Sequence, residues 1–115
     1  MAKGLVKVAK TSDIAVGCIK VFEIEDISIA VCNVGGEFYA VENVCTHDDA
    51  PLGEGTLIGK EIECPRHRAR FDVTTGAVTR LPAYAPLRTF PVIISESRSA
   101  SGGEDNIISI DISAY

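Results

Sequence analysis

The sequence lacks several features, and each absence narrows what the protein can be. No apolar run approaches the roughly 20 residues of a membrane-spanning helix; the run from Val92 to Ile94 is typical of those present. Eleven Lys and Arg against sixteen Asp and Glu give a net charge of −5, which argues against nucleic acid or an anionic membrane as a partner. The first residues include no apolar stretch of signal-peptide length, so we expect a cytoplasmic protein.

What is present indicates one globular β domain. Hydrophobic residues make up 46% of the 115 residues and charged residues 23%, which is typical of a folded domain. No stretch has a sustained helical period, so we predict an antiparallel all-β fold. Short alternating runs separated by turn residues predict strands at 5–8, 18–24, 27–34, 37–42, 56–58, 61–63, 70–73, 77–79, 87–95 and 106–112. We expect Pro91 to lie at an edge or bulge of the strand 87–95.

Two Cys/His pairs form the one constellation with evident chemistry. Cys45-Thr46-His47 is followed sixteen residues later by Cys64-Pro65-Arg66-His67, and together they use both histidines of the chain. Thiolate with imidazole is a ligand set for zinc or for an iron–sulfur cluster. A Cys₂His₂ zinc finger pairs Cys with Cys and His with His, whereas here each loop supplies one of each. The order of the ligands, Cys then His in each loop, therefore favours a binuclear iron–sulfur cluster. A zinc-stapled binding module remains the alternative.

The same segment carries a family resemblance. The run CTH…CPRHRARFDVTTGAVTRLPA resembles the cluster-binding segment of Rieske-type ferredoxins, the small electron carriers of multicomponent bacterial oxygenases such as aromatic-ring-hydroxylating dioxygenases. The resemblance implies one 2Fe–2S cluster with Cys45 and Cys64 on one iron and His47 and His67 on the other. It also implies a single domain over 1–115, in which a cluster-binding subdomain at about 43–84 is inserted into a basal β-sandwich.

The residues around the ligands separate this chain from the quinol-oxidising branch that it resembles less. That branch has two further cysteines that form a disulfide between the loops, and here their places hold Ala50 and Arg66. It also has a serine and a tyrosine that donate hydrogen bonds near the cluster, where this chain has Ala69 and Phe71. Losing such hydrogen bonds lowers the reduction potential, so we expect a midpoint near the bottom of the Rieske range of roughly −150 to +300 mV.

The resemblance also implies the partners. A low-potential carrier can take electrons from an NAD(P)H-dependent flavoprotein reductase and pass them to a terminal oxygenase, docking near His47 and His67. Both histidines are used by the cluster, so no mononuclear iron site is left and we expect a carrier rather than an enzyme. A Rieske-type small subunit of another reductase, such as nitrite reductase, is the runner-up.

We also expect charged residues and a proline-containing segment to surround the predicted cluster. Charges at the tip come from both loops: Asp48 and Asp49 from the first, and Arg66, Arg68 and Arg70 from the second. Arg68 stands where relatives commonly have glycine, and we expect Arg66 and Arg68 to influence partner choice. The segment Leu81-Pro82-Ala83 resembles the proline loop that covers the cluster in this family.

The two remaining cysteines lie on a predicted hairpin that turns at Glu25-Asp26. This register places Cys18 opposite Asn33, and Cys32 opposite Ile19. Because neighbours on a strand point to opposite faces, we predict that the thiols do not meet and that both pack as partly buried small hydrophobes.

Overall fold

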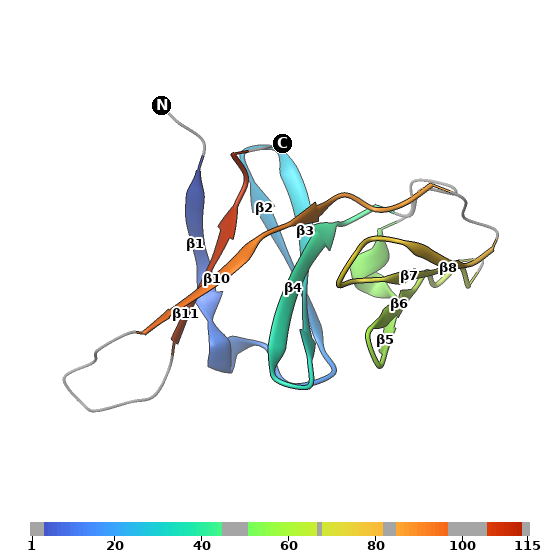
Figure 1. Cartoon of the computed structure of the whole chain (residues 1–115), viewed down its shortest axis with the longest axis horizontal. Helices are drawn as coiled ribbons and strands as arrows, with labels where there is room; N and C mark the ends of the chain where they lie inside the picture. The colour runs from blue at the N-terminus through green and yellow to red at the C-terminus, as the bar shows by residue number, and fades with distance from the viewer. Residues whose placement is uncertain (1–3, 45–50, 67, 82–84, 97–105, 114–115) are drawn as a thin grey trace.

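The fold is a stack of three antiparallel sheets (Figure 1). The computed structural model describes residues 4–44, 51–66, 68–81, 85–96 and 106–113. The first sheet has the order β1 (Leu5–Lys10), β11 (Asn106–Asp111), β10 (Val92–Glu96). The second has the order β2 (Ile19–Ile24), β3 (Ile27–Val34), β4 (Glu37–Glu42), β9 (Thr89–Phe90). The third runs β5 (Thr56–Ile58), β6 (Glu61–Glu63), β7 (Arg70–Asp72), β8 (Val78–Arg80).

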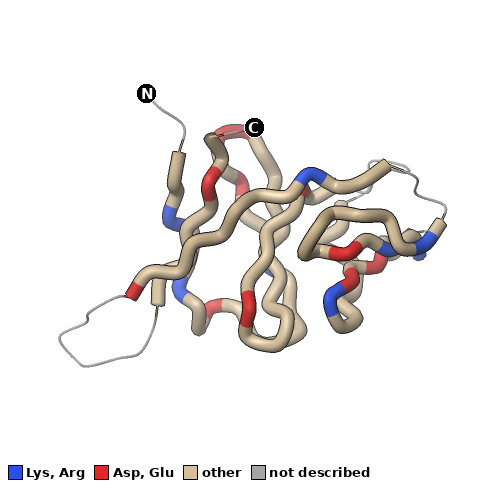
Figure 2. The backbone as a smooth tube through the Cα atoms, in the orientation of Figure 1, with Lys and Arg blue, Asp and Glu red and all other residues tan. Residues whose placement is uncertain are grey.

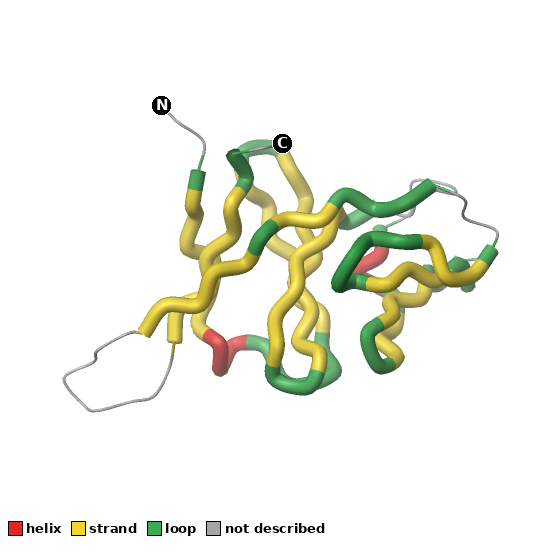
Figure 3. The backbone as a smooth tube through the Cα atoms, viewed as in Figure 1, coloured by secondary structure: helices red, strands yellow, loops and turns green. Residues whose placement is uncertain are grey.

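Apart from strands, the described residues contain two single-turn 3₁₀ helices, η1 (Thr11–Asp13) and η2 (Leu52–Glu54), and Figure 3 shows how little of the chain they occupy. The predicted antiparallel all-β fold is therefore confirmed. The tight turns also fall where the sequence places them. Gly35 and Gly36 connect β3 to β4 with φ of 61° and 99°, values that glycine adopts without the steric penalty of a side chain.

Strand β3 is the centre of the molecule because both of its faces are buried. Ile29 and Val31 face the first sheet, in a core with Ile108 and Ile110 of β11. The alternate residues, among them Ala30 and Cys32, face the other way, into a second core built with the third sheet. The second sheet is thus the middle layer, and its near-continuous apolar sequence in β3 follows from that position.

One predicted element is wrong. The single strand expected at 87–95 is two short strands, β9 and β10, which belong to different sheets. β9 pairs with β4 through Ala40↔Phe90, whereas β10 pairs with β11 through Val92↔Ile110. Pro91 lies between them, and because proline has no N–H to donate, it interrupts the ladder where the chain crosses from one sheet to the next.

The predicted hairpin register around the cysteines is correct. Ile19 pairs with Cys32, and the Asn33 amide donates to the Cys18 carbonyl at 3.1 Å. Both thiols are free, as predicted, but their burial differs from the prediction: Cys18 is exposed and Cys32 is fully buried. Burial raises the pKa of Cys32 to about 12, so this thiol is protonated at neutral pH.

Candidate metal centre

The structure places one of the four predicted ligands. Cys64 follows β6 directly and is fully buried, whereas Cys45, His47 and His67 lie outside the described residues, as do Asp48, Asp49 and Pro82. Within the described ranges, consequently, no three Cys, His, Asp or Glu side chains come together as a metal site. The ligand set stays a prediction, and what the structure adds is the framework on which the ligands are carried.

The second ligand loop, residues 64–69, is closed on itself at the tip of the β6–β7 hairpin. The Cys64 amide donates to the Ala69 carbonyl at 2.8 Å, and the Arg68 amide donates back to the Cys64 carbonyl at 3.0 Å. Below the loop, Glu63 and Arg70 are paired across the two strands. These backbone bonds fix the position of Cys64 relative to the sheet.

Charged side chains brace the neck of this loop. The Nε of Arg70 lies 3.0 Å from Oε2 of Glu63 and a second guanidinium nitrogen lies 3.7 Å from Glu61, while Arg80 approaches Glu63 at 3.9 Å. Arg70, expected among the charges at the tip, is instead 28% exposed and engaged in this cluster. Ion pairs thus link β6, β7 and β8 at the base of the second ligand loop.

Arg68 adopts a backbone conformation that is unusual for a side chain of its size. Its φ is 61°, in the left-handed region that glycine adopts without the steric penalty of a side chain. Such a conformation costs a residue with a Cβ about 1–2 kcal/mol. The side chain is exposed, and the structure gives it no ion pair or hydrogen bond within the described residues.

The first ligand loop, residues 44–51, is pinned at its two ends by Asn43. Its side-chain carbonyl accepts a hydrogen bond from the Gly53 amide at 2.6 Å, and its Nδ2 donates to Ser28 of β3 at 3.1 Å. Sequence reasoning missed this role. The available signal was an Asn two residues before the first Cys-x-His, facing a glycine just after the loop.

A close backbone contact joins the segment that follows the first ligand loop to the strand that precedes the second. A Cβ added to Gly55, just after η2, would lie 2.0 Å from the Glu63 carbonyl oxygen. Leu52 of η2 is fully buried in the same core as Cys64, Ala69 and Phe71. The contact extends the β5–β6 pairing, in which Thr56 lies opposite Glu63, and it brings the chain after η2 next to the residue that precedes Cys64.

The surroundings of Cys64 fit a buried metal–sulfur centre. Its thiol is a soft donor in an apolar core, and Ala69 and Phe71 beside it are both fully buried. Neither side chain carries a hydroxyl to bond a sulfur. The donor type and the closed loop both suit an iron–sulfur cluster with little hydrogen bonding to its sulfurs.

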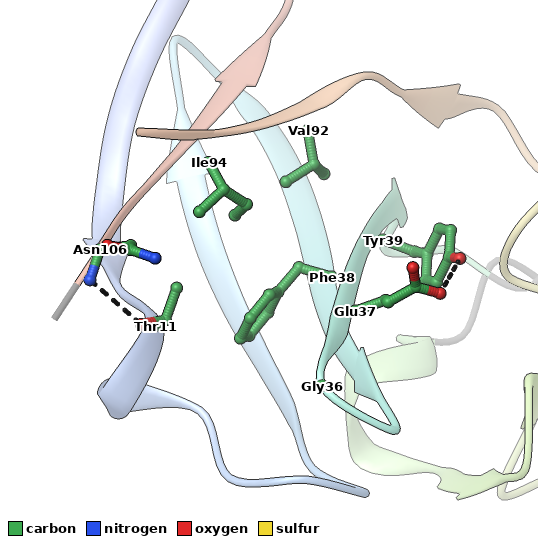
Figure 4. Close-up of a pocket in the computed structure, with 8 residues that line it drawn as sticks. All are labelled: Thr11, Gly36, Glu37, Phe38, Tyr39, Val92, Ile94 and Asn106. Atoms are coloured by element: carbon green, nitrogen blue, oxygen red, sulfur yellow. Dashed lines mark hydrogen bonds between the residues drawn. The ribbon is translucent and has the colours of Figure 1, made fainter. Parts of the chain in front are cut away.

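A cavity of about 470 Å³ lies elsewhere, between β4 and β10 (Figure 4). Phe38, Val92 and Ile94 point into it, while Tyr39 turns away and donates a hydrogen bond to Glu37 at 3.2 Å. With one carboxylate and neither Cys nor His in its lining, this cavity offers no metal chemistry.

Comparison with known proteins decides the family. The model of the Rieske [2Fe-2S] domain matches residues 4–91. The chain belongs to this family. The ferredoxin component of biphenyl 2,3-dioxygenase from Rhodococcus jostii (strain RHA1) is 47% identical over 88 residues, which cover 76% of this chain and 82% of that protein. A chain in the complex of reduced oxygenase and oxidized ferredoxin of carbazole 1,9a-dioxygenase is 35% identical, with a TM-score of 0.77 and coverage of 93% and 92%.

Membership of the Rieske family bears on the two alternatives from the sequence, a zinc-stapled binding module and a subunit of another reductase. The cofactor of the family is a 2Fe–2S cluster, so the zinc-stapled module is not supported, and the homologues are electron carriers rather than enzymes. The small subunit of a Mycobacterium tuberculosis nitrite reductase has a TM-score of 0.76 but is 16% identical, a likeness that shows the fold alone. No helix in the described ranges is long and apolar enough to cross a membrane.

Proposed function

We propose that this Rieske protein carries single electrons from an NAD(P)H-dependent flavoprotein reductase to a terminal oxygenase. The observation that carries the proposal is the closed 64–69 loop, which holds a fully buried thiol at the tip of a hairpin in a chain that matches the Rieske model. The names of the relatives, ferredoxin components of dioxygenase systems, support the partner classes. A cytoplasmic location is part of the proposal, and the free thiols of Cys18 and Cys32 agree with a reducing compartment.

The proposed ligands are Cys45, His47, Cys64 and His67, within a cluster-binding subdomain at about 43–84. When bound, the cluster supplies one-electron chemistry at an iron whose imidazole ligands keep the site less negative than thiolates would. Cys64, buried at the start of the second ligand loop, would hold one iron together with Cys45. His47 and His67 would hold the other iron, and partners would dock over them to exchange the electron.

Paired cysteine substitutions test the ligand assignment. Cys64→Ala removes a proposed ligand, whereas Cys32→Ala removes an equally buried thiol from the middle of β3. We expect the first variant to lose the visible absorption and the rhombic, low-average-g EPR signal of the reduced protein, and the second to keep both. A brown Cys64→Ala protein with an unchanged EPR signal, or a colourless wild type that contains zinc, would contradict the proposal.

A further inference from the structure

The cations of this acidic chain are concentrated around the second ligand loop. Residues 56–90 contain six Lys and Arg against three Asp and Glu, while the whole chain carries −5. In Figure 2 the blue segments of this end gather on the third sheet and the neighbouring chain, and the base is richer in red. The distribution indicates a local surface whose charge differs from that of the molecule.

Most of these cations have partners inside the protein. Arg70 and Arg80 bind Glu63, and Lys60 lies 3.3 Å from Asp72 on β7. Arg66 and Arg88 also make contacts of their own. Arg68 differs from them: its exposed guanidinium has no partner within the described residues, so its charge is available to another molecule.

Arg68 also lowers the stability of the fold it belongs to. At φ 61° a glycine would fit the loop without strain, and no contact of the Arg68 side chain in the described part compensates for the difference. A strained, solvent-facing residue beside the loop that carries a proposed ligand is best explained by an external contact.

We propose that Arg68 is a docking residue that binds a carboxylate on the surface of the electron-transfer partner. The proposal rests on the proposed function, because it places the contact one residue from His67, where the electron leaves. A guanidinium presents paired N–H donors to a carboxylate, which fixes orientation as well as attraction.

Small redox probes of opposite charge test this inference on the holo-protein. Stopped-flow mixing of the reduced protein with ferricyanide, or with tris(phenanthroline)cobalt(III), transfers one electron and yields ferrocyanide or cobalt(II). The ferricyanide trianion stands in for the carboxylate. At low salt we expect Arg68→Gly to react about three- to tenfold more slowly with ferricyanide and correspondingly faster with the cobalt complex. Both differences shrink at about 0.5 M salt.

Matched variants separate the local charge of Arg68 from a change in total charge, in midpoint potential or in stability. Arg68→Lys retains the charge and reacts within about twofold of wild type. Lys7→Gln removes the same charge from β1, in the sheet farthest from the third sheet (Figure 1), and leaves both rates unchanged. A shift in midpoint potential moves both reactions in one direction, whereas a local charge moves them in opposite directions. Arg68→Gly also unfolds at a temperature equal to or above that of wild type.

Equal rates for Arg68→Gly and wild type at low salt would overturn the inference, and so would an equal effect of Lys7→Gln. Loss of the cluster or a lower unfolding temperature in Arg68→Gly would show instead that Arg68 is structural. Failure of the proposed function is a separate outcome, because it appears before mixing, as a protein with no reducible cluster.

Discussion

The basal sandwich, made of the first and second sheets, and the third sheet are stabilised in different ways. The sandwich has mostly five- to eight-residue strands around a core in which seven of ten buried residues are isoleucine. The third sheet has four three-residue strands, bordered by ion pairs, capped turns and close backbone contacts. The stabilisation from apolar burial depends on the buried area, and a core tolerates small shifts of its side chains. The ion pairs, capped turns and backbone contacts of the third sheet, by contrast, form only when their atoms are accurately placed. Both regions bury an apolar core, and the third sheet adds contacts that define the geometry around the ligand loops.

Truncating the sandwich core gives the largest expected effect and the strongest test of this division. Ile108 of β11 is fully buried in the basal core, so Ile108→Ala should lower the free energy of unfolding by about 4 kcal/mol. Urea unfolding measures the loss, and the EPR signal of the protein that remains folded should be that of wild type. An altered EPR signal in folded Ile108→Ala would show that the two regions are not separable.

A substitution between the segments that carry the ligand loops should affect the cluster more than the stability of the fold. In Gly55→Ala the new methyl group meets the Glu63 carbonyl, so the loops must separate, at a cost of about 2–3 kcal/mol. We expect a larger loss of bound iron than of stability, measured by iron content and urea unfolding. Gly4→Ala is the matched control, because nothing lies within 4 Å of a Cβ at that position. Full iron content in Gly55→Ala would show that the loops can move apart without releasing the cluster.

A hydroxyl beside Cys64 tests how far the apolar surroundings set the potential. Ala69→Ser restores the donor type of the quinol-oxidising branch at a fully buried position of the second ligand loop. A hydrogen bond to a sulfur that becomes more negative on reduction should raise the midpoint by about 40–80 mV, equivalent to roughly 1–2 kcal/mol for one electron. Redox titration measures it. A wild-type midpoint above about +100 mV would contradict the low-potential assignment itself.

The sequence predicted the third sheet nearly as well as the sandwich, but for different reasons. Gly59-Lys60 marks its first hairpin, and turn chemistry acts over a few residues that are adjacent in the chain. The predicted turn at Glu25-Asp26 likewise set the register of β3 with β2. The division of 87–95 was missed because nothing local specifies that Phe90 pairs in one sheet and Val92 in another. That choice is made by the two cores.

The candidate site shows the same limit. Cys45, His47, Cys64 and His67 could be selected from the sequence because their chemistry is a property of residue type and spacing. The role of Asn43 could not, because its contacts with Ser28 and Gly53 form only in the folded chain. The nearness of Gly55 to Glu63 follows from the predicted β5–β6 hairpin, but the closeness of their contact does not. The conformation of Arg68 was foreshadowed only by the glycine that relatives commonly have there.

The smallest predicted effect depends on pH and on Asp72, at the end of β7. Burial acts to raise the pKa of this carboxyl, but hydrogen bonds from the amide and hydroxyl of Thr74, together with Lys60, outweigh it and hold the pKa below its usual range. A lowered pKa in the folded state means that the carboxylate stabilises the fold above the unfolded-state pKa of about 3.9. That contribution is lost as the pH falls through the folded value.

Replacing the charge with an amide measures this contribution directly. Asp72→Asn keeps an oxygen for Thr74 and loses the charge, so at pH 7 it should be less stable than wild type by about 0.5–1 kcal/mol. The difference, followed by urea unfolding from pH 7 down to about pH 2.5, should persist above about pH 4 and narrow below it as the wild-type carboxylate protonates. Glu23→Gln, an exposed carboxylate on β2, should show no such trend. A deficit in Asp72→Asn that stayed constant across this range would mean that the oxygen geometry of the turn, and not the charge, braces β7 beneath the second ligand loop.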